Sequence, residues 1–192
     1  NIPEWFIESC KKISYLFPRA HAVAYVMMAF RIAWFKVYHP LAFYAAYFSI
    51  RAKAFDLRIM TGDLKTQLTE FNRIKALDRA ASPKDKDLMS ALEVSMEMYQ
   101  RGYRFINVDI QHSEARRFSI KDGALLPPFL AIDSLGETVA DAIVEERNER
   151  PFTSLKDLQR RCKVSNTIID LMKDLKCCGE LPEDEQMSLF GA

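Results

Sequence analysis

The stretch from Ala131 to Gly136 has the residue types of a tight turn that leads straight into a helix. Ile132 and Leu135 are apolar, and a helical pattern runs from Glu137 to Arg147. The first amide groups of a helix lack intrahelical partners and lie at the positive end of its dipole, and glycine allows close approach to them. The turn therefore predicts an anion site that suits a phosphate, although an ordinary helix start in a small helical domain explains it equally well.

A second turn of the same kind follows. Ser154 and Asp157 form a capping-box pattern at the start of a short helix, and a turn at residues 162–165 leads into the helix predicted for 166–175, with Ser165 as its cap. Helix, hairpin and helix in tandem predict a compact domain that grips the DNA backbone without reading sequence. The residues we expect to contact DNA are Ser134, Gly136, Thr138, Arg161, Lys163, Ser165 and Asn166.

Charge does not by itself indicate a nucleic-acid-binding protein. The 192 residues carry a net charge of +1, and residues 126–192 hold eight Lys and Arg against thirteen Asp and Glu. Asp133 and Glu137 flank the first turn and would repel DNA. Any DNA contact in this region must be local, and a basic stretch that could provide it comprises Arg147, Arg150, Lys156, Arg160, Arg161 and Lys163.

Composition argues for an ordinary water-soluble protein. The longest hydrophobic run, Ala20 to Phe30, is short of the ~20 residues that cross a bilayer, and no signal peptide is recognisable. We therefore expect a cytoplasmic protein without a membrane partner. The four cysteines form no C-x-x-C pair, which argues against zinc. A helical pattern is already under way near Asn1-Ile2-Pro3, so we expect a fragment of a longer protein.

Most of the remaining chain has helical periodicity, so the fold class is predicted to be mainly α. Ser82-Pro83-Lys84-Asp85 has the residues of a capping box. The expected helices cover residues 3–13, 18–38, 41–51, 56–81 and 82–102, and a small β patch is predicted from residues 103–110 and 117–120, with a turn at 121–124.

The last residues differ from the rest. Residues 182–185 are acidic and led by proline, which predicts a mobile, exposed tail. Its end carries Leu189 and Phe190, two large apolar side chains that a solvated tail does not need. Docking into a partner's pocket explains them, and folding back onto the parent domain is the alternative.

Three blocks of sequence resemble the C-terminal end of C-family bacterial replicative DNA polymerases, specifically the PolC type of polymerase III alpha subunit. The resemblance covers essentially the whole chain. Its strongest parts are Glu8-Ser9-Cys10-Lys11-Lys12-Ile13 with Phe17-Pro18-Arg19-Ala20-His21-Ala22-Val23-Ala24-Tyr25, then Phe35-Lys36-Val37-Tyr38-His39-Pro40, and the terminal Gln186-Met187-Ser188-Leu189-Phe190.

The resemblance implies a domain plan. Residues 1–102 would be the C-terminal part of the polymerase fingers, 103–125 a small β-containing connector, 126–181 a tandem helix-hairpin-helix domain on duplex DNA, and 182–192 a flexible clamp-binding tail. The implied sliding-clamp residues are Gln186, Met187, Ser188, Leu189 and Phe190. The implied nucleotide-binding residues, for which core packing and a simple helix C-terminus are the alternatives, are Lys11, Lys12, Phe17, Arg19, His21 and Tyr25.

The resemblance also implies an enzyme, a DNA-directed DNA polymerase that transfers nucleotidyl groups with magnesium held on paired carboxylates. It places those carboxylates before Asn1, so we expect this fragment to hold no cofactor and to be inactive alone. The implied partners are double-stranded primer-template DNA, a deoxynucleoside triphosphate and the sliding clamp. The alternatives are a non-catalytic helix-hairpin-helix adaptor that tethers a clamp and a helical interaction module without DNA affinity.

Overall fold

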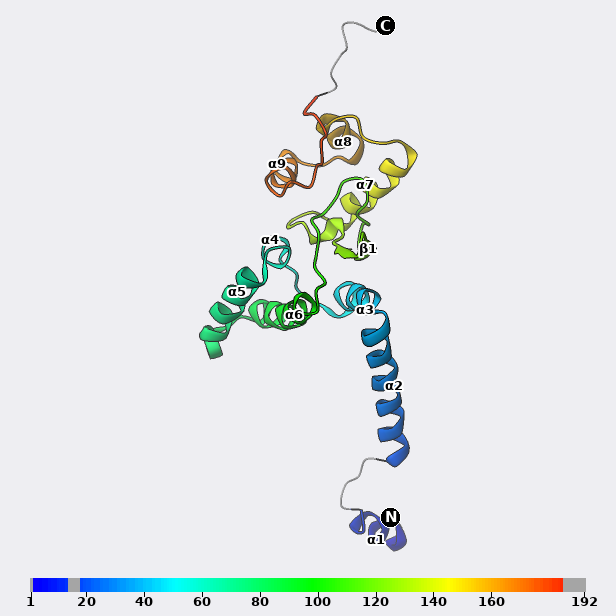
Figure 1. Ribbon diagram of the computed structural model, residues 1–192. Coiled ribbons are helices and arrows are strands. Elements are labelled where there is room, and N and C mark those ends of the chain that lie inside the picture. The colour runs from blue at the N-terminus through cyan, green and yellow to red at the C-terminus, as the bar shows by residue number, and fades with distance from the viewer. Residues whose placement is uncertain (1, 14–17, 185–192) are drawn as a thin grey trace, which may run out of the picture. The chain divides into compact units, whose positions relative to one another are not determined.

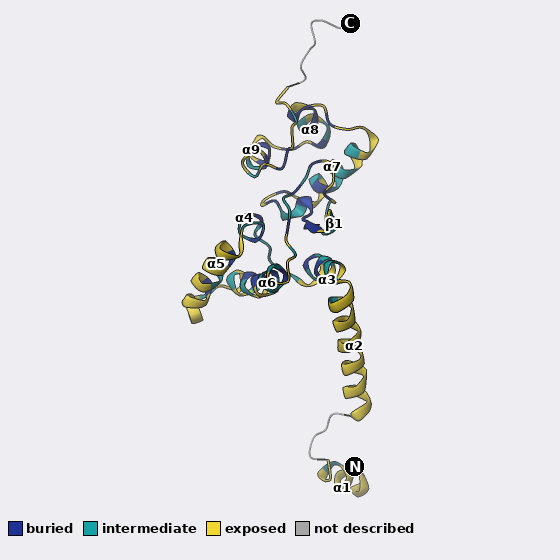
Figure 2. Ribbon diagram, in the orientation of Figure 1, coloured by how far each residue is buried: buried dark blue, intermediate teal, exposed yellow. Residues whose placement is uncertain are grey.

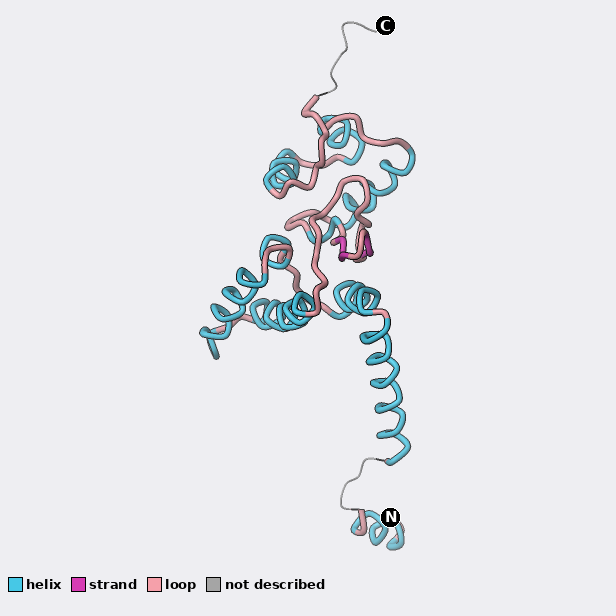
Figure 3. Tube along the Cα trace, viewed as in Figure 1, coloured by secondary structure: helices cyan, strands magenta, loops and turns pink. Residues whose placement is uncertain are grey.

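The computed structural model describes residues 2–13 and 18–184. The chain divides into two units, residues 1–40 and 41–192. Helices dominate both units, and the described strands make one two-stranded sheet (Figures 1 and 3). The prediction of a mainly α fold with a small β patch is therefore confirmed.

The first unit contains two helices. Helix α1 covers Glu4–Lys11 and helix α2 covers Arg19–Tyr38, close to the predicted ranges. Pro18 is the N-cap of α2, where its missing N–H costs nothing, and His39 is the C-cap.

Helix α2 has no distinct polar face. Apart from Lys36 it is exposed along its whole length, as Figure 2 shows. Val23, Phe30 and Trp34 are among its exposed large side chains. The helix continues past Arg31 for another two turns. By length and composition alone this 20-residue helix could cross a membrane, so the length of the apolar run does not exclude a span. A helix of this kind needs a covering, and the described residues of the first unit, 2–13 and 18–40, leave it exposed.

The second unit begins with a short helical series. Helix α3 (Pro40–Ala46) continues into a π-helical segment, η1 (Tyr47–Arg51), followed by α4 (Leu57–Met60), α5 (Leu64–Leu77) and the 3₁₀ turn η2 (Asp78–Ala80). A single helix over residues 56–81 was predicted, and this prediction is wrong. Asp56 and Asp63 each cap a separate helix, accepting from the amides of Ile59 and Thr66 at 3.0 and 2.7 Å.

Helix α6 (Pro83–Gln100) packs against α5 and completes the first hydrophobic core. Its predicted capping box is confirmed, because Ser82 accepts from the Asp85 amide at 3.1 Å and Asp85 accepts from the Ser82 amide at 3.0 Å. Tyr44, Met60 and Leu92 are fully buried in this core.

The β patch is smaller than predicted. Strands β1 (Ser119–Lys121) and β2 (Ala124–Leu126) pair antiparallel around Asp122-Gly123, both at positive φ. Residues 103–110, predicted as a strand, form only one isolated bridge, between Phe105 and Leu125. Their apolar side chains alternate, but they are buried among helices rather than paired along a second ladder.

The last part of the second unit holds the 3₁₀ turn η3 (Phe129–Ala131) and helices α7 (Glu137–Glu149), α8 (Leu155–Cys162) and α9 (Asn166–Asp174). A second core lies among them and includes Ile132, Ile143, Leu158 and Met172. The short helical turn η3 precedes the first hairpin, and the predicted tandem arrangement of two helical hairpins is present.

Candidate nucleic-acid interface

The first hairpin joins η3 to α7 and is held by two apolar anchors. Ile132 and Leu135 are 1% and 5% exposed, and the Leu135 amide donates to the Ile132 carbonyl at 3.2 Å. Between them Ser134 has a φ of 63°, in the left-handed region that side chains resist. The anchors therefore hold the turn in a conformation that serine alone would not choose.

The N-terminus of α7 is open. Gly136 is its N-cap, with a φ of −75° and no side chain to accept from the first-turn amides. A Cβ built at Gly136 would meet nothing within 4 Å. The fold therefore requires glycine here neither for its backbone angle nor for space within the described chain. What glycine provides is unobstructed access to the amides of the first turn, next to the exposed Thr138.

Arg116 pairs with two acids of α7 beside this hairpin, Glu137 and Asp141. Its guanidinium pairs with Glu137 at 2.6 Å and makes a two-pronged contact with Asp141, in which the Nε donates at 3.0 Å. The hydrogen bonds from Arg116 lower the pKa of Asp141. The repulsion expected from Glu137 is therefore reduced, and sequence reasoning missed Arg116 because it lies 21 residues before its partner.

The second hairpin joins α8 to α9. Lys163 ends α8 in the left-handed conformation, with φ 54° and ψ 37°, and its side chain is exposed. Val164 is 3% exposed. Ser165 is the N-cap of α9 and accepts from the Ile168 amide at 3.3 Å, while the Asn166 side chain accepts from Gln159.

The two hairpins repeat one local pattern. Each has a left-handed residue, then a buried apolar residue, then the N-cap of the following helix: Ser134, Leu135 and Gly136 in the first, and Lys163, Val164 and Ser165 in the second. Each pattern brings the start of a helix to the surface, where its amide groups and dipole favour an anion.

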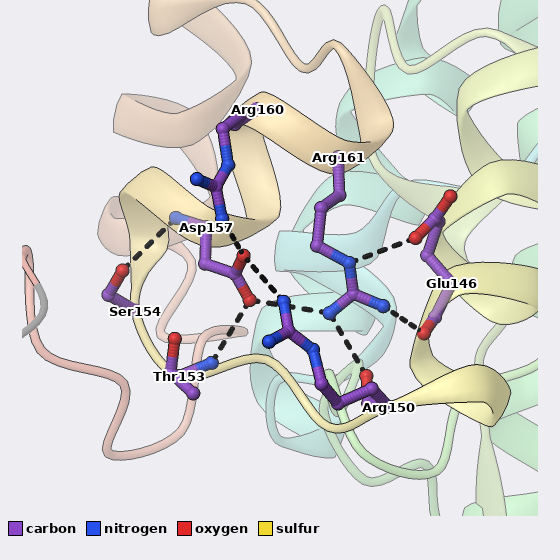
Figure 4. Close-up of polar contacts among 7 residues, drawn as sticks. All are labelled: Glu146, Arg150, Thr153, Ser154, Asp157, Arg160 and Arg161. Atoms are coloured by element: carbon purple, nitrogen blue, oxygen red, sulfur yellow. Dashed lines mark hydrogen bonds and ion pairs between the residues drawn. The ribbon is translucent and has the colours of Figure 1, made fainter.

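Arg161, predicted to contact DNA, lies in a polar network that joins α8 to the C-terminal end of α7 (Figure 4). Its side chain is 11% exposed, and its guanidinium pairs with Glu146 at 2.9 Å and Asp157 at 3.3 Å and stacks 4.7 Å from the Phe152 ring. It also donates to the backbone carbonyls of Glu146 and Arg150. This geometry favours a structural role for Arg161 over a phosphate contact.

Asp157 is the centre of that network (Figure 4). Its fully buried carboxylate accepts from Arg160 at 2.8 Å, from Arg150 at 3.3 Å and from the Thr153 amide at 3.3 Å. Burial raises the pKa of Asp157, but these hydrogen bonds together outweigh it and hold the pKa below its usual value. The capping box predicted here is half correct, because Ser154 accepts from the Asp157 amide, whereas the Asp157 carboxylate reaches Thr153.

The other cations of the basic stretch divide into two groups. Arg147 is partly buried, donates to the carbonyls of Ile110 and Ser113 at 3.1 and 2.8 Å, and has its pKa lowered by burial. Arg150, Lys156 and Arg160 keep side chains that are 58%, 66% and 70% exposed. The stretch therefore offers exposed charge at some positions and structural arginines at others.

The predicted nucleotide-binding residues lie in the first unit. Lys11 pairs with Glu8 at 2.9 Å, Lys12 is the C-cap of α1, and Arg19 begins α2. His21 and Tyr25 share a face of α2, with ring centroids 4.4 Å apart. Phe17 and the predicted clamp-binding residues 186–190 lie outside the described residues. These roles stay predictions.

One Asp-x-Asp sequence occurs, Asp85-Lys86-Asp87 in the first turns of α6. Asp85 caps α6 and lies 3.6 Å from Arg73. Within residues 2–13 and 18–184, no group of three or more His, Cys, Asp or Glu side chains is arranged to hold a metal ion.

Comparison with known proteins agrees with this architecture. A family model described as "Helix-hairpin-helix motif" matches residues 102–186, so the second unit contains a helix-hairpin-helix module. The chain is also 48% identical over 190 residues to "DNA polymerase III PolC-type" of Caldanaerobacter subterraneus subsp. tengcongensis, and 47% identical over 193 residues to the protein of that name from Streptococcus pyogenes serotype M12.

These alignments cover 99% of this chain but only 14% and 13% of the two relatives. The chain thus spans a small part of the length of the proteins it matches. Over that part it belongs to the PolC-type DNA polymerase III family.

Proposed function

We propose that this chain is the part of a replicative DNA polymerase that holds the backbone of duplex DNA with its two hairpins. The repeated pattern of left-handed residue, buried anchor and N-cap carries the proposal, because it presents two helix N-termini from one module. The family of its relatives and the helix-hairpin-helix match support it.

The two hairpins would hold phosphates by different groups. At the first, the open amides after Gly136 and the hydroxyls of Ser134 and Thr138 are the donors. At the second, Lys163 adds a full charge beside the α9 N-terminus, with Ser165 and Asn166 next to it. Contacts of this kind fix a protein's position on the duplex without specifying sequence, and they weaken steeply with salt.

The same proposal extends to the longer protein. Nucleotidyl transfer, with magnesium as the cofactor and a deoxynucleoside triphosphate as substrate, would belong to residues outside this chain, and the chain alone would be inactive. The remaining roles assigned by resemblance are nucleotide contacts by Lys11, Lys12, Phe17, Arg19, His21 and Tyr25, and sliding-clamp binding by residues 186–190.

Helix α2 supports a place inside a larger assembly. A helix that is apolar on all sides is buried either in a large protein or in a bilayer. The relatives are several times longer than this chain, so a covering within one polypeptide is the simpler explanation, and a cytoplasmic location goes with it. Flotation with liposomes would contradict this explanation if the chain moved with the lipid.

Fluorescence anisotropy of labelled duplex DNA, measured across a salt series, tests the DNA-binding role. Lys163→Ala should weaken binding and lower the salt dependence by about one unit of slope, as expected for one lost phosphate contact. Lys86→Ala is the matched control, because it removes one exposed positive charge from α6. Absence of binding at low salt, or equal effects of the two substitutions, would contradict the proposal.

A further inference from the structure

Helix α8 carries a row of exposed cations that leads to the second hairpin. Lys156 and Arg160 are four residues apart, on one face of the helix, and Lys163 follows at its C-cap. One helical turn separates successive charges by about 5–6 Å along the axis. This cationic row would allow the phosphate contact at the second hairpin to continue along the strand.

An acidic strap, residues Pro182–Asp184, is fastened over the start of this row. The Leu155 amide donates to the Pro182 carbonyl at 2.9 Å, and the Lys156 amide donates to the Glu183 carbonyl at 3.2 Å. These two amides belong to the first turn of α8. Strap carbonyls therefore occupy the donors that a helix N-terminus would otherwise offer to an anion.

Strap carboxylates also occupy the side-chain cations. Lys156 pairs with Asp184 at 2.5 Å, and Lys173 of α9 pairs with Glu183 at 2.7 Å. The hydrogen bonds raise the pKa of both lysines, and the one from Lys173 lowers the pKa of Glu183. An open recess next to the strap is lined by Lys156, Asp157, Arg160 and Asp184 among others.

The strap contacts are of a kind that another anion can replace. The carboxylates of Glu183 and Asp184 are 80% and 63% exposed, and exposed ion pairs are weak and screened by salt. The strap and a nucleic-acid backbone offer the same kinds of group, negative charges that lysines bind and oxygen acceptors that helix amides bind. Residues 182–184, predicted to belong to a mobile, exposed tail, are exposed and contact α8 and α9.

We propose that the acidic strap is a built-in competitor for DNA, which backbone phosphates displace from Lys156, Lys173 and the start of α8. The proposal rests on the DNA-binding function proposed above.

The affinity test uses the full 192-residue chain and labelled duplex DNA. Glu183→Gln with Asp184→Asn should tighten binding roughly three- to tenfold at low salt, since two exposed ion pairs are removed from competition. Glu145→Gln with Glu149→Gln is the matched control, which changes the net charge equally at exposed positions of α7. In a background of Lys156→Ala and Lys173→Ala, the gain from the strap substitutions should disappear.

Hydrogen exchange gives a readout that does not depend on affinity. If saturating duplex DNA displaces the strap and leaves the Leu155 and Lys156 amides without an acceptor, these amides should exchange faster. If DNA phosphates take the place of the strap carbonyls, the amides should stay protected only while DNA is bound, and the strap variant should show the same DNA-dependent protection. If the wild-type chain binds DNA but the strap variant matches its control and the exchange of both amides is unchanged, the strap proposal is overturned and DNA binding stands. If the wild-type chain does not bind at all, the proposed function fails first.

Discussion

The two hairpins have the same backbone pattern but present positive charge in opposite ways. The first is capped by Gly136, which gives the first-turn amides of α7 no side-chain acceptor, and Glu137 and Asp141 beside it pair with Arg116. The second is capped by the Ser165 side chain and carries the exposed Lys163 at its left-handed position. In the proposed function, the first hairpin would therefore hold a phosphate with oriented dipoles and the second with a full charge, and only the second attraction would depend strongly on salt.

The side chains that hold each hairpin in place also differ, and a substitution among them should give the largest change in stability. The first hairpin is anchored by apolar side chains, whereas the second is backed by the buried Asp157 and its arginines. Asp157→Asn should lower the free energy of unfolding by about 2–4 kcal/mol. The substitution removes one of the two carboxylates that pair with the largely buried Arg161 guanidinium. Chemical denaturation measures this difference.

Asp170→Asn, at an exposed position of α9, is the control and should change stability little. The pH dependence provides a second check. Because the folded-state pKa of Asp157 is depressed, its contribution is present above the ordinary carboxyl pKa and is lost as pH falls through the folded value. The Asn variant should therefore lose less stability on acidification than the wild type, and an identical acid profile would contradict the role assigned to Asp157.

The caps themselves should separate folding from binding. Gly136→Ala should leave folding almost intact, because the added Cβ meets nothing, yet weaken DNA binding about tenfold if a phosphate approaches the α7 amides closely. Ser165→Ala should do the reverse and cost about 1 kcal/mol of stability through the lost cap, with a smaller effect on DNA. Thermal unfolding and anisotropy on both variants give the comparison.

Equal effects of the two substitutions on DNA binding would contradict the distinction between a first hairpin that binds through helix amides and a second that binds through the charge of Lys163. Loss of folding in Gly136→Ala would show that the glycine serves the fold instead of the ligand.

Arg116 should matter to the first hairpin only through the acids it neutralises. Arg116→Gln is expected to weaken DNA binding a few-fold, because Glu137 and Asp141 then face the phosphates unpaired. Adding Glu137→Gln should restore much of the affinity. If the double variant binds no better than the single one, Arg116 contacts DNA directly and the first hairpin also depends on a full charge.

Local signals in the sequence were enough to predict both hairpins, because each hairpin is encoded within a few residues by an apolar anchor and the N-cap of the next helix. The capping box of α6 and the ends of α2 were predictable for the same reason. The single helix predicted over residues 56–81 failed because Gly62 and the cap at Asp63 interrupt an otherwise continuous periodicity.

Local signals did not predict which arginines and lysines are exposed and which are held in ion pairs. Arg161 and Lys163 each carry one positive charge. The Arg161 side chain is largely buried and pairs with Glu146 and Asp157, whereas the Lys163 side chain is exposed. The pairing of Arg116 with α7 and of Lys173 with the strap likewise depends on chain packing between separate segments. Long-range partners decide which cations remain available to DNA.

The smallest expected effect concerns the left-handed residue that both hairpins share. Ser134→Gly and Lys163→Gly should each raise the free energy of unfolding by about 0.5 kcal/mol. Glycine removes the strain of a side chain at a φ near 60°, and the larger entropy that glycine loses on folding offsets only part of this gain. Their effects on DNA should differ: Ser134→Gly should keep the affinity, since the amides of α7 remain, and Lys163→Gly should weaken it and flatten the salt dependence. Lys176→Gly is the control, because Lys176 has a φ of 56° and an exposed side chain outside both hairpins. A loss of affinity in Lys176→Gly equal to that in Lys163→Gly would mean that net charge, and not the second hairpin, governs binding.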